Sequence, residues 1–186
     1  MKGADVDDIV AFLTDLFRRR GAEAYLGESV TMAQHMLQAA HHACRAGASD
    51  SQTAAALLHD VGHFAGDLAD DAWARGTDDH AAGGAALLAP WFGPAVTEPI
   101  RLHVPAKRYL CAVEPAYLGA LSPASVHTLG LQGGAMSRDE VAAFEATPFG
   151  QEAVAVRRWD DGGKVADVAT PAFESYLPLL RRLLRP

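Results

Sequence analysis

The sequence predicts an all-α protein, and three observations lead to this fold class. Apolar residues recur at helical spacing through most of the chain. Residues that favour the beginnings and ends of helices stand on either side of these segments. Strand signals are scarce, because the valines are scattered and never alternate convincingly with polar residues. A single helical bundle that spans residues 1–186 is therefore the expected architecture.

Four helices are expected in the first half of the chain. In order, they cover residues 5–20, 31–46, 50–63 and 79–88. The first carries a stripe of apolar side chains: Val6, Ile9, Val10, Leu13, Leu16 and Phe17. Gly21 and Gly47 follow the first two helices as C-terminal glycines. Asp50 can cap the third helix, and Pro90 ends the fourth.

The second half is expected to hold three more helices. A capping box at residues 137–140 opens a helix that runs through Phe144. Further helices are expected over residues 149–160 and 173–184, and Pro178 should kink or split the last one. Residues 21–29 and 105–134 are expected to be irregular, and such segments often carry functional sites.

Composition narrows the class of protein. The chain has 186 residues and a net charge of -7, so a nucleic-acid or anionic-membrane surface is not the default expectation. Cys44 and Cys111 are the only cysteines, and neither lies in a CxxC pair, which argues against a disulfide framework or a thiolate zinc site. The N-terminus lacks a secretory pattern, and no apolar run approaches the roughly 20 residues that span a bilayer. A cytoplasmic location is expected by default.

The segment LLHDVGHF, residues 57–64, places three potential metal ligands at the end of an apolar run. On a continuous helix, His59 and His63 are four residues apart and share a face. Asp60 lies beside them, and a carboxylate in apolar surroundings is costly to bury unless it is paired or bound to a metal. Imidazole and carboxylate ligands together suit iron, manganese, zinc and related divalent ions.

Residues elsewhere in the chain extend this candidate metal site. A single histidine on a helix is more often hydrogen-bonded than a ligand, and we assign that ordinary role to His41, His42 and His127. A His-Asp pair in an apolar run, with several further candidates at other helices, favours metal binding. Those candidates are His35, His80, His103 and Asp160. So many ligands with one central carboxylate suggest two ions, and Asp60 is the natural bridge between them.

The ordered set His35, His59-Asp60 and Asp160 resembles the signature of the HD-domain superfamily. His80 and His103 resemble the additional ligands of its members that bind two metals. Phosphohydrolases and oxygenases share these features. A narrower resemblance separates them: YLGESVTMAQHMLQAA (25–40), LSPASVHTLGLQGGAM (121–136) and RRWDDGGK (157–164) are similar to segments of the HD-domain mixed-valent diiron oxygenases that cleave organophosphonates, the PhnZ and TmpB type.

The resemblance implies two iron ions, as an Fe(II)/Fe(III) pair, and assigns residues to them. One iron would be held by His35, His59, Asp60 and Asp160. The other would be held by Asp60, His80 and His103, with Tyr25 closing its open position until substrate arrives. Glu28 would face an amino or ammonium group. The phosphonate would be bound by His63, Lys107, Ser125, Thr128 and Arg157.

The implied reaction uses O2 to cleave the C–P bond of a 1-hydroxy-2-amino- or 1-hydroxy-2-trimethylammonio-ethylphosphonate-like substrate. It yields a carboxylate and inorganic phosphate. A quaternary ammonium would also favour aromatic walls, for which the available side chains are Trp73, Trp91, Phe92, Tyr109 and Trp159. The main alternative is a two-metal phosphohydrolase acting on a phosphomonoester or nucleotide, which has no need of Tyr25 with Glu28. A third reading is an HD domain that only binds a ligand or partner.

Overall fold

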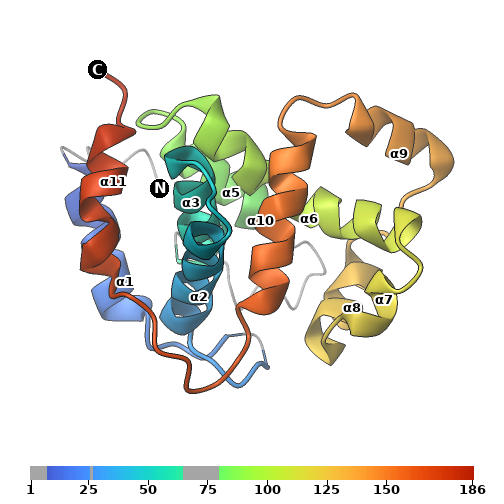
Figure 1. Ribbon diagram of the computed structural model, residues 1–186, viewed down its shortest axis with the longest axis horizontal. Helices are drawn as coiled ribbons and strands as arrows, with labels where there is room; N and C mark the ends of the chain where they lie inside the picture. Colours follow the sequence, from blue (N-terminus) through green and yellow to red (C-terminus); the bar gives the residue numbers. More distant parts are fainter. Residues whose placement is uncertain (1–7, 26, 65–79) are drawn as a thin grey trace.

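The computed structural model describes residues 8–25, 27–64 and 80–186, and these residues confirm an all-α fold (Figure 1). None of them belongs to a β-strand; two isolated bridges join Ala24 to Thr31 and Phe92 to Leu184. Within this part of the chain, no helix combines the length and apolar character needed to cross a membrane.

Helix α1 (Ile9–Arg20) begins at Asp8, whose carboxylate accepts hydrogen bonds from the backbone N–H groups of Val10 and Ala11. The expected first turn of this helix, residues 5–7, lies outside the described residues. The predicted apolar stripe is buried from Ile9 onward. It packs toward the C-terminal elements η2 (Phe173–Tyr176) and α11 (Leu177–Arg182). Pro178 stands in the first turn of α11, so the last helix is split there as expected.

Helices α2 (Met32–Arg45) and α3 (Asp50–Leu58) form the centre of the molecule. A capping box opens each of them, at Thr31 and at Ser49, so the third helix is capped by Ser49 and not by Asp50 as expected. Gly47 follows α2 with a φ of 70°, which confirms it as a C-terminal glycine.

The expected continuation of α3 to His63 is wrong. The α-helix ends at Leu58, and a separate 3-10 turn, η1 (Val61–His63), follows. Gly62 lies so close to the next helix that a Cβ there would stand 2.0 Å from the backbone oxygen of His80. This contact draws the chain toward α5 (His80–Leu88), which packs against η1. His59 and His63 are therefore not related by the spacing of one helix.

The prediction that residues 105–134 are irregular is also largely wrong. Helix α6 (Pro94–Val113) passes through both Pro99 and Pro105, and two helices follow it, α7 (Tyr117–Ala120) and α8 (Pro123–Leu131). A proline inside a helix removes a backbone hydrogen bond. Here α6 packs along α3, α5 and α10, and that tertiary packing offsets the loss.

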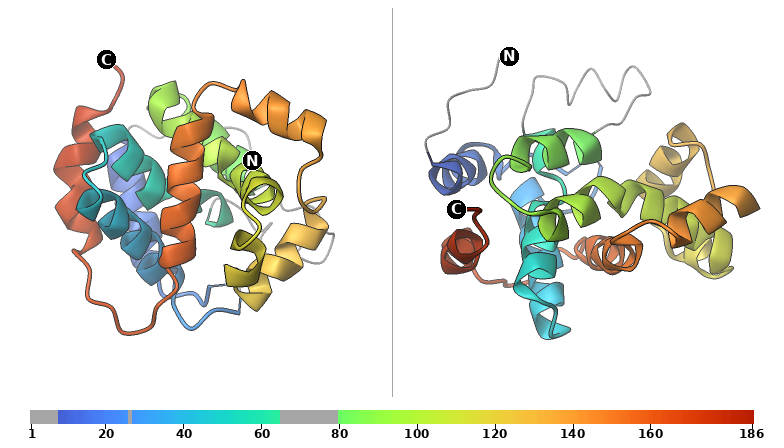
Figure 2. Two further views of the ribbon diagram at one scale, coloured as in Figure 1. Left: turned by 45° about the vertical axis from the view of Figure 1, so that its right-hand side comes forward. Right: turned by 90° about the horizontal axis from the view of Figure 1, so that it is seen from above.

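Helix α9 (Arg138–Glu145) opens with the predicted capping box at Ser137, and α10 (Gly150–Gly162) crosses the molecule between α2 and α6. The three views show α1 and α11 together on one side of the central helices and α7, α8 and α9 on the other (Figures 1 and 2). Four helices thus pack against one another in the middle of the molecule: α2, α3, α6 and α10.

Candidate metal centre and adjoining pocket

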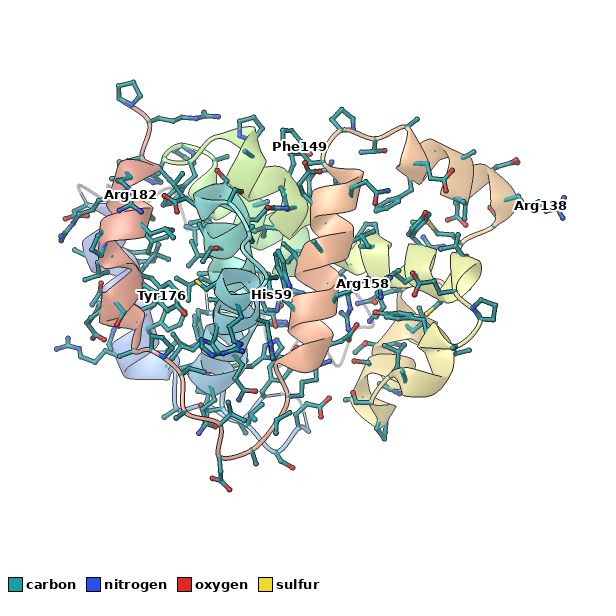
Figure 3. The ribbon with its side chains drawn as sticks, in the orientation of Figure 1. His59, Arg138, Phe149, Arg158, Tyr176 and Arg182 are labelled. Carbon is teal, nitrogen blue, oxygen red and sulfur yellow. The ribbon has the colours of Figure 1, made fainter. Side chains whose placement is uncertain are left out.

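The six predicted metal ligands come together at the centre of the fold, from five separate helical elements. His35 is on α2, His59 and Asp60 follow α3, His80 begins α5, His103 is on α6 and Asp160 is on α10. His59 lies between α3 and α10 in Figure 3. All six are buried except His80, which is half-buried. Two histidine pairs can be distinguished: an inner pair, His35 with His59, and an outer pair, His80 with His103.

The inner pair has its ring nitrogens arranged for a cation. The Nδ1 atoms of His35 and His59 contact the backbone oxygens of Gly163 at 3.0 Å and of Ala56 at 2.9 Å. A carbonyl only accepts, so each Nδ1 carries a proton, and a ring with no second proton presents a lone pair at Nε2. The two Nε2 atoms are 3.0 Å apart. Two lone pairs at such a short separation repel each other unless a cation lies between them.

The outer pair repeats this arrangement. The Nε2 atoms of His80 and His103 are 3.1 Å apart, and Nδ1 of His103 donates to the backbone oxygen of Ile100 at 2.7 Å. Burial lowers the pKa of His103, which keeps its ring neutral and its Nε2 lone pair available.

Asp60 lies between the two pairs and turns one oxygen toward each. Its Oδ2 is 3.3 Å from Nε2 of His59 and 3.4 Å from Nε2 of His35. Its Oδ1 is 3.2 Å from Nε2 of His80 and 3.5 Å from Nε2 of His103. One carboxylate therefore faces two groups of nitrogen donors, as a bridging ligand would.

Two buried carboxylate oxygens at the centre accept no hydrogen bond from the described residues: Oδ2 of Asp60 and Oδ1 of Asp160. Burial alone would raise the pKa of Asp60, but the neighbouring histidines, His59 first, hold that pKa well below its usual value. Arg157 and then Lys164 likewise lower the pKa of Asp160 against the effect of burial. Ionised, buried and unsatisfied oxygens beside imidazole lone pairs fit a metal site.

His63 stands at the edge of this cluster. Its Nε2 is 4.0 Å from Oδ1 of Asp60, and its ring stacks on that of His80 with centroids 4.0 Å apart. The geometry groups His63 with Asp60 and His80 as a possible ligand set. Its contact with Asp60 is nevertheless longer than those of His80 and His103, and its side chain is 13% exposed. The assignment of His63 to the substrate stays a prediction.

A pocket opens beside the outer pair. Its lining includes Asp60, His63, His80 and His103, whereas neither His35 nor His59 lines it. Three predicted phosphonate-binding residues line the same pocket, namely Lys107, which lies one turn after His103 on α6, and Ser125 and Thr128 on α8. The Nζ of Lys107 is buried and donates to Oγ1 of Thr128 at 2.8 Å.

Tyr25 and Glu28 line the same pocket from the loop before α2. The ring of Tyr25 stacks on that of His35, with centroids 3.9 Å apart. Burial, followed by the charges of Asp60 and Asp160, raises the pKa of Tyr25 well above its usual value. The backbone N–H of Glu28 donates to the backbone carbonyl oxygen of Tyr25 at 2.7 Å, and Oγ of Ser122 donates to Oε1 of Glu28 at 2.5 Å.

Arg157 lines the pocket, but its hydrogen bonds run to protein groups. Its Nη1 is 2.7 Å from Oδ2 of Asp160, and its Nε donates to the hydroxyl of Tyr117 and to Oδ2 of Asp161, both at 3.1 Å. Its Nη2 donates to the other oxygen of Asp161. The side chain predicted to bind the phosphonate therefore also holds a predicted metal ligand, Asp160, in place.

Sequence reasoning did not single out Lys164, which lines the pocket and donates from Nζ to Oγ of Ser125 at 2.9 Å. The signal was present, since Lys164 ends the segment RRWDDGGK and lies four residues after Asp160. It is close to the site because the chain leaves α10 and stays beside α2.

The aromatic side chains considered for an ammonium wall lie elsewhere. Phe92 is buried in the main core, and Trp91 and Trp159 pack against it. Tyr109 stacks on Phe144. Trp73 lies outside the described residues. Among the described lining residues, Tyr25 supplies the aromatic surface.

No family model matches the chain. The [1-hydroxy-2-(trimethylamino)ethyl]phosphonate dioxygenase (glycine-betaine-forming) of Leisingera caerulea is 45% identical over 183 residues, which cover 95% of this chain and 91% of the relative. The hydroxymethylphosphonate dioxygenase of Gimesia maris is 48% identical over 169 residues, which cover 90% and 84%. An uncharacterized protein of Acanthamoeba polyphaga mimivirus is 31% identical over 172 residues. The chain belongs to the HD-domain phosphonate dioxygenases of the PhnZ and TmpB type.

Proposed function

We propose that this protein is a non-haem diiron oxygenase that uses O2 to cleave the C–P bond of a 1-hydroxyalkylphosphonate with a 2-amino or 2-trimethylammonio group. The products are a carboxylate and inorganic phosphate. One observation carries the proposal: a single pocket is lined by the outer histidine pair and Asp60 together with a lysine and two hydroxyl side chains, Lys107, Ser125 and Thr128. The dioxygenase names of two relatives support the same chemistry.

Two iron ions would be held on either side of Asp60. The inner ion would take His35, His59 and Asp160, and the outer ion would take His80 and His103. The donor set, imidazoles with carboxylates, is one that suits iron. When bound, the iron pair supplies activation of O2 and the electron transfers that a protein side chain cannot perform.

The residues of the chain itself bind and orient the substrate. Lys107 and the hydroxyls of Ser125 and Thr128 offer a positive charge and neutral donors to the phosphonate oxygens. His63, beside His80, is assigned to the same group of substrate contacts. Arg157 pairs with Asp160 and lines the pocket, so it would add positive charge beside the phosphonate. These contacts would bring C1 of the substrate next to the outer pair.

Glu28 and Tyr25 would act from the loop before α2. The Glu28 carboxylate, fixed by Ser122, is placed to attract an ammonium group. Tyr25 is buried against His35 and would cover the outer ion until substrate displaces it. Its ring limits access of water to the centre in the meantime.

The atom balance gives a sharp test. The products carry one oxygen more on carbon and one more on phosphorus than the substrate, so one O2 is consumed for each phosphate released. The protein is purified from iron-supplemented cells, and its iron content is measured. O2 uptake and phosphate release are then followed with (2-amino-1-hydroxyethyl)phosphonate, its trimethylammonio analogue and hydroxymethylphosphonate.

We expect equal O2 uptake and phosphate release with at least one of these compounds. Phosphate release from phosphomonoesters without O2 uptake would instead identify a phosphohydrolase. A Glu28→Gln variant tests the substrate class. It should weaken turnover of the two cationic substrates and leave turnover of hydroxymethylphosphonate unchanged, because only the former carry a charge for Glu28 to attract.

A further inference from the structure

A second lysine, Lys164, lines the same pocket as Lys107. It follows α10 and its side chain is 11% exposed. Its backbone is fixed on both sides by α2. The Gly163 oxygen contacts Nδ1 of His35 at 3.0 Å, and the Gln38 side chain makes two hydrogen bonds with the backbone of Val165, at 2.8 and 3.2 Å. Lys164 is therefore held in position and is not a mobile surface side chain.

Lys164 and Lys107 make matching contacts on one face of α8. Lys107 donates to Oγ1 of Thr128 at 2.8 Å, and Lys164 donates to Oγ of Ser125 at 2.9 Å. Ser125 and Thr128 are three residues apart, so both hydroxyls share a helix face. Because Lys164 donates into the Ser125 oxygen, the Ser125 hydroxyl keeps its own proton to donate to an acceptor. A cationic donor also polarises that hydroxyl and strengthens the second bond.

The acidic neighbours of Lys164 lie farther away than Ser125. Oδ1 of Asp160 and Oδ1 of Asp161 are each 3.6 Å from its Nζ, beyond ordinary hydrogen-bond distance. Arg157 approaches both carboxylates more closely, at 2.7 Å for Asp160. The main partner of Lys164 is thus a pocket hydroxyl, and not the carboxylates of α10.

We propose that Lys164 is a further substrate-binding residue, the second lysine of the phosphonate site, acting on the anion directly and through Ser125. This inference rests on the proposed function, which supplies the phosphonate. A phosphonate dianion carries more charge than one lysine neutralises, and two lysines with two hydroxyls match it better. The competing role for Lys164 is to neutralise Asp160 and so support the metal centre.

The test uses the iron-loaded protein with Lys164→Met, which removes the charge but keeps an unbranched side chain. Arg158→Met is the matched control, since Arg158 is on α10, the helix that Lys164 follows, is exposed and pairs with Glu114 outside the pocket. Three quantities are measured: iron per chain, the Kd of methylphosphonate by calorimetry, and KM with kcat from O2 uptake. Methylphosphonate presents the anion without the hydroxyl or ammonium groups.

We expect Lys164→Met to keep its iron and to raise the Kd of methylphosphonate and the KM by about tenfold, as the loss of one charge-assisted contact implies. The kcat should change less, and Arg158→Met should match the unsubstituted protein. Lys164→Gln retains a donor toward Ser125 without the charge, so it should give an intermediate Kd. If Lys164→Met does not fold, the same measurements on Lys164→Gln provide the test.

Loss of iron in both Lys164 variants, or unchanged Kd and KM, would overturn the inference. The outcomes also separate the two proposals. If methylphosphonate binding depends on Lys164 but O2 uptake is not coupled to phosphate release, the anion site is supported and the proposed reaction is refuted. If coupled turnover occurs and does not depend on Lys164, the reaction is supported and the role of Lys164 is refuted.

Discussion

The two histidine pairs differ in their exposure to the pocket. The inner pair is completely buried, and neither ring lines the pocket. Both rings of the outer pair line it. Asp60 touches both pairs. Ring nitrogens of the outer pair therefore face a molecule in the pocket directly, whereas Asp160 is the inner-site residue that lines it, so we expect substrate contact mainly at the outer pair.

The two pairs also differ in how they are built. The inner histidines stand on α2 and directly after α3, two central helices that both open with capping boxes. The outer pair relies on the first residue of α5, which is set by the close approach of Gly62 and Gly84. The inner pair should accordingly withstand local changes that disturb the outer one.

Replacement of Asp60 by alanine should have the largest effect, because it removes the one side chain that serves both pairs. Iron content should fall from two ions to nearly none, and O2 uptake should disappear. The two ions would lose their shared carboxylate ligand as well. Metal analysis and an oxygen electrode measure both quantities. A variant that still holds one tightly bound iron would show that the pairs are independent.

Gly62→Ala should separate the two pairs. The new Cβ would lie 2.0 Å from the His80 backbone oxygen and 2.9 Å from the Gly84 nitrogen, so α5 must move away. We expect loss of the outer iron, retention of the inner iron and loss of turnover. Gly83→Ala is the control, since a Cβ there meets nothing within 4 Å, and it should stabilise the helix by about 1 kcal/mol. Full iron in Gly62→Ala would refute the dependence on this contact.

His63→Ala should act on the substrate and not on the metals. His63 is farther from Asp60 than either outer histidine. Both irons should remain, while KM rises by about tenfold, the typical cost of one charge-assisted hydrogen bond. Iron analysis and steady-state O2 uptake distinguish these effects. If His63→Ala loses iron as completely as His59→Ala, then His63 is a ligand and the division of roles is wrong.

Tyr117→Phe should have the smallest effect. The hydroxyl of Tyr117 accepts from Arg157 and donates to Asp161, so its removal loosens the residues that hold Asp160. We expect the free energy of unfolding to fall by about 1 kcal/mol, with iron retained. Urea unfolding measures this. Tyr109→Phe, whose hydroxyl contacts only the exposed side chain of Glu145, is the matched control and should change stability less.

Most of the centre could be predicted from the sequence because its residues are chemically distinctive. Histidines and aspartates in apolar runs are costly to bury unless they are paired or bind a metal, and all six candidate ligands converge. Capping boxes at Thr31 and Ser137 likewise mark helix starts locally. The continuity of α6 through Pro105 could not be predicted, because it depends on packing against other helices. Lys164 was missed for a similar reason, since its contact with Ser125 joins residues 39 positions apart.

The short segment from residue 162 to 165 constrains any redesign of this protein. It supports His35 through the Gly163 oxygen, Gln38 through Val165, and Ser125 through Lys164. A Cβ at Gly163 would lie 2.9 Å from the His35 oxygen, so even the smallest substitution would collide. Glu28, by comparison, lines the pocket and accepts a hydrogen bond from Ser122, whose Oγ also caps α8 by accepting from the backbone N–H of Ser125. Engineers who seek a new substrate range should vary residue 28 and leave residues 122 and 162–165 untouched.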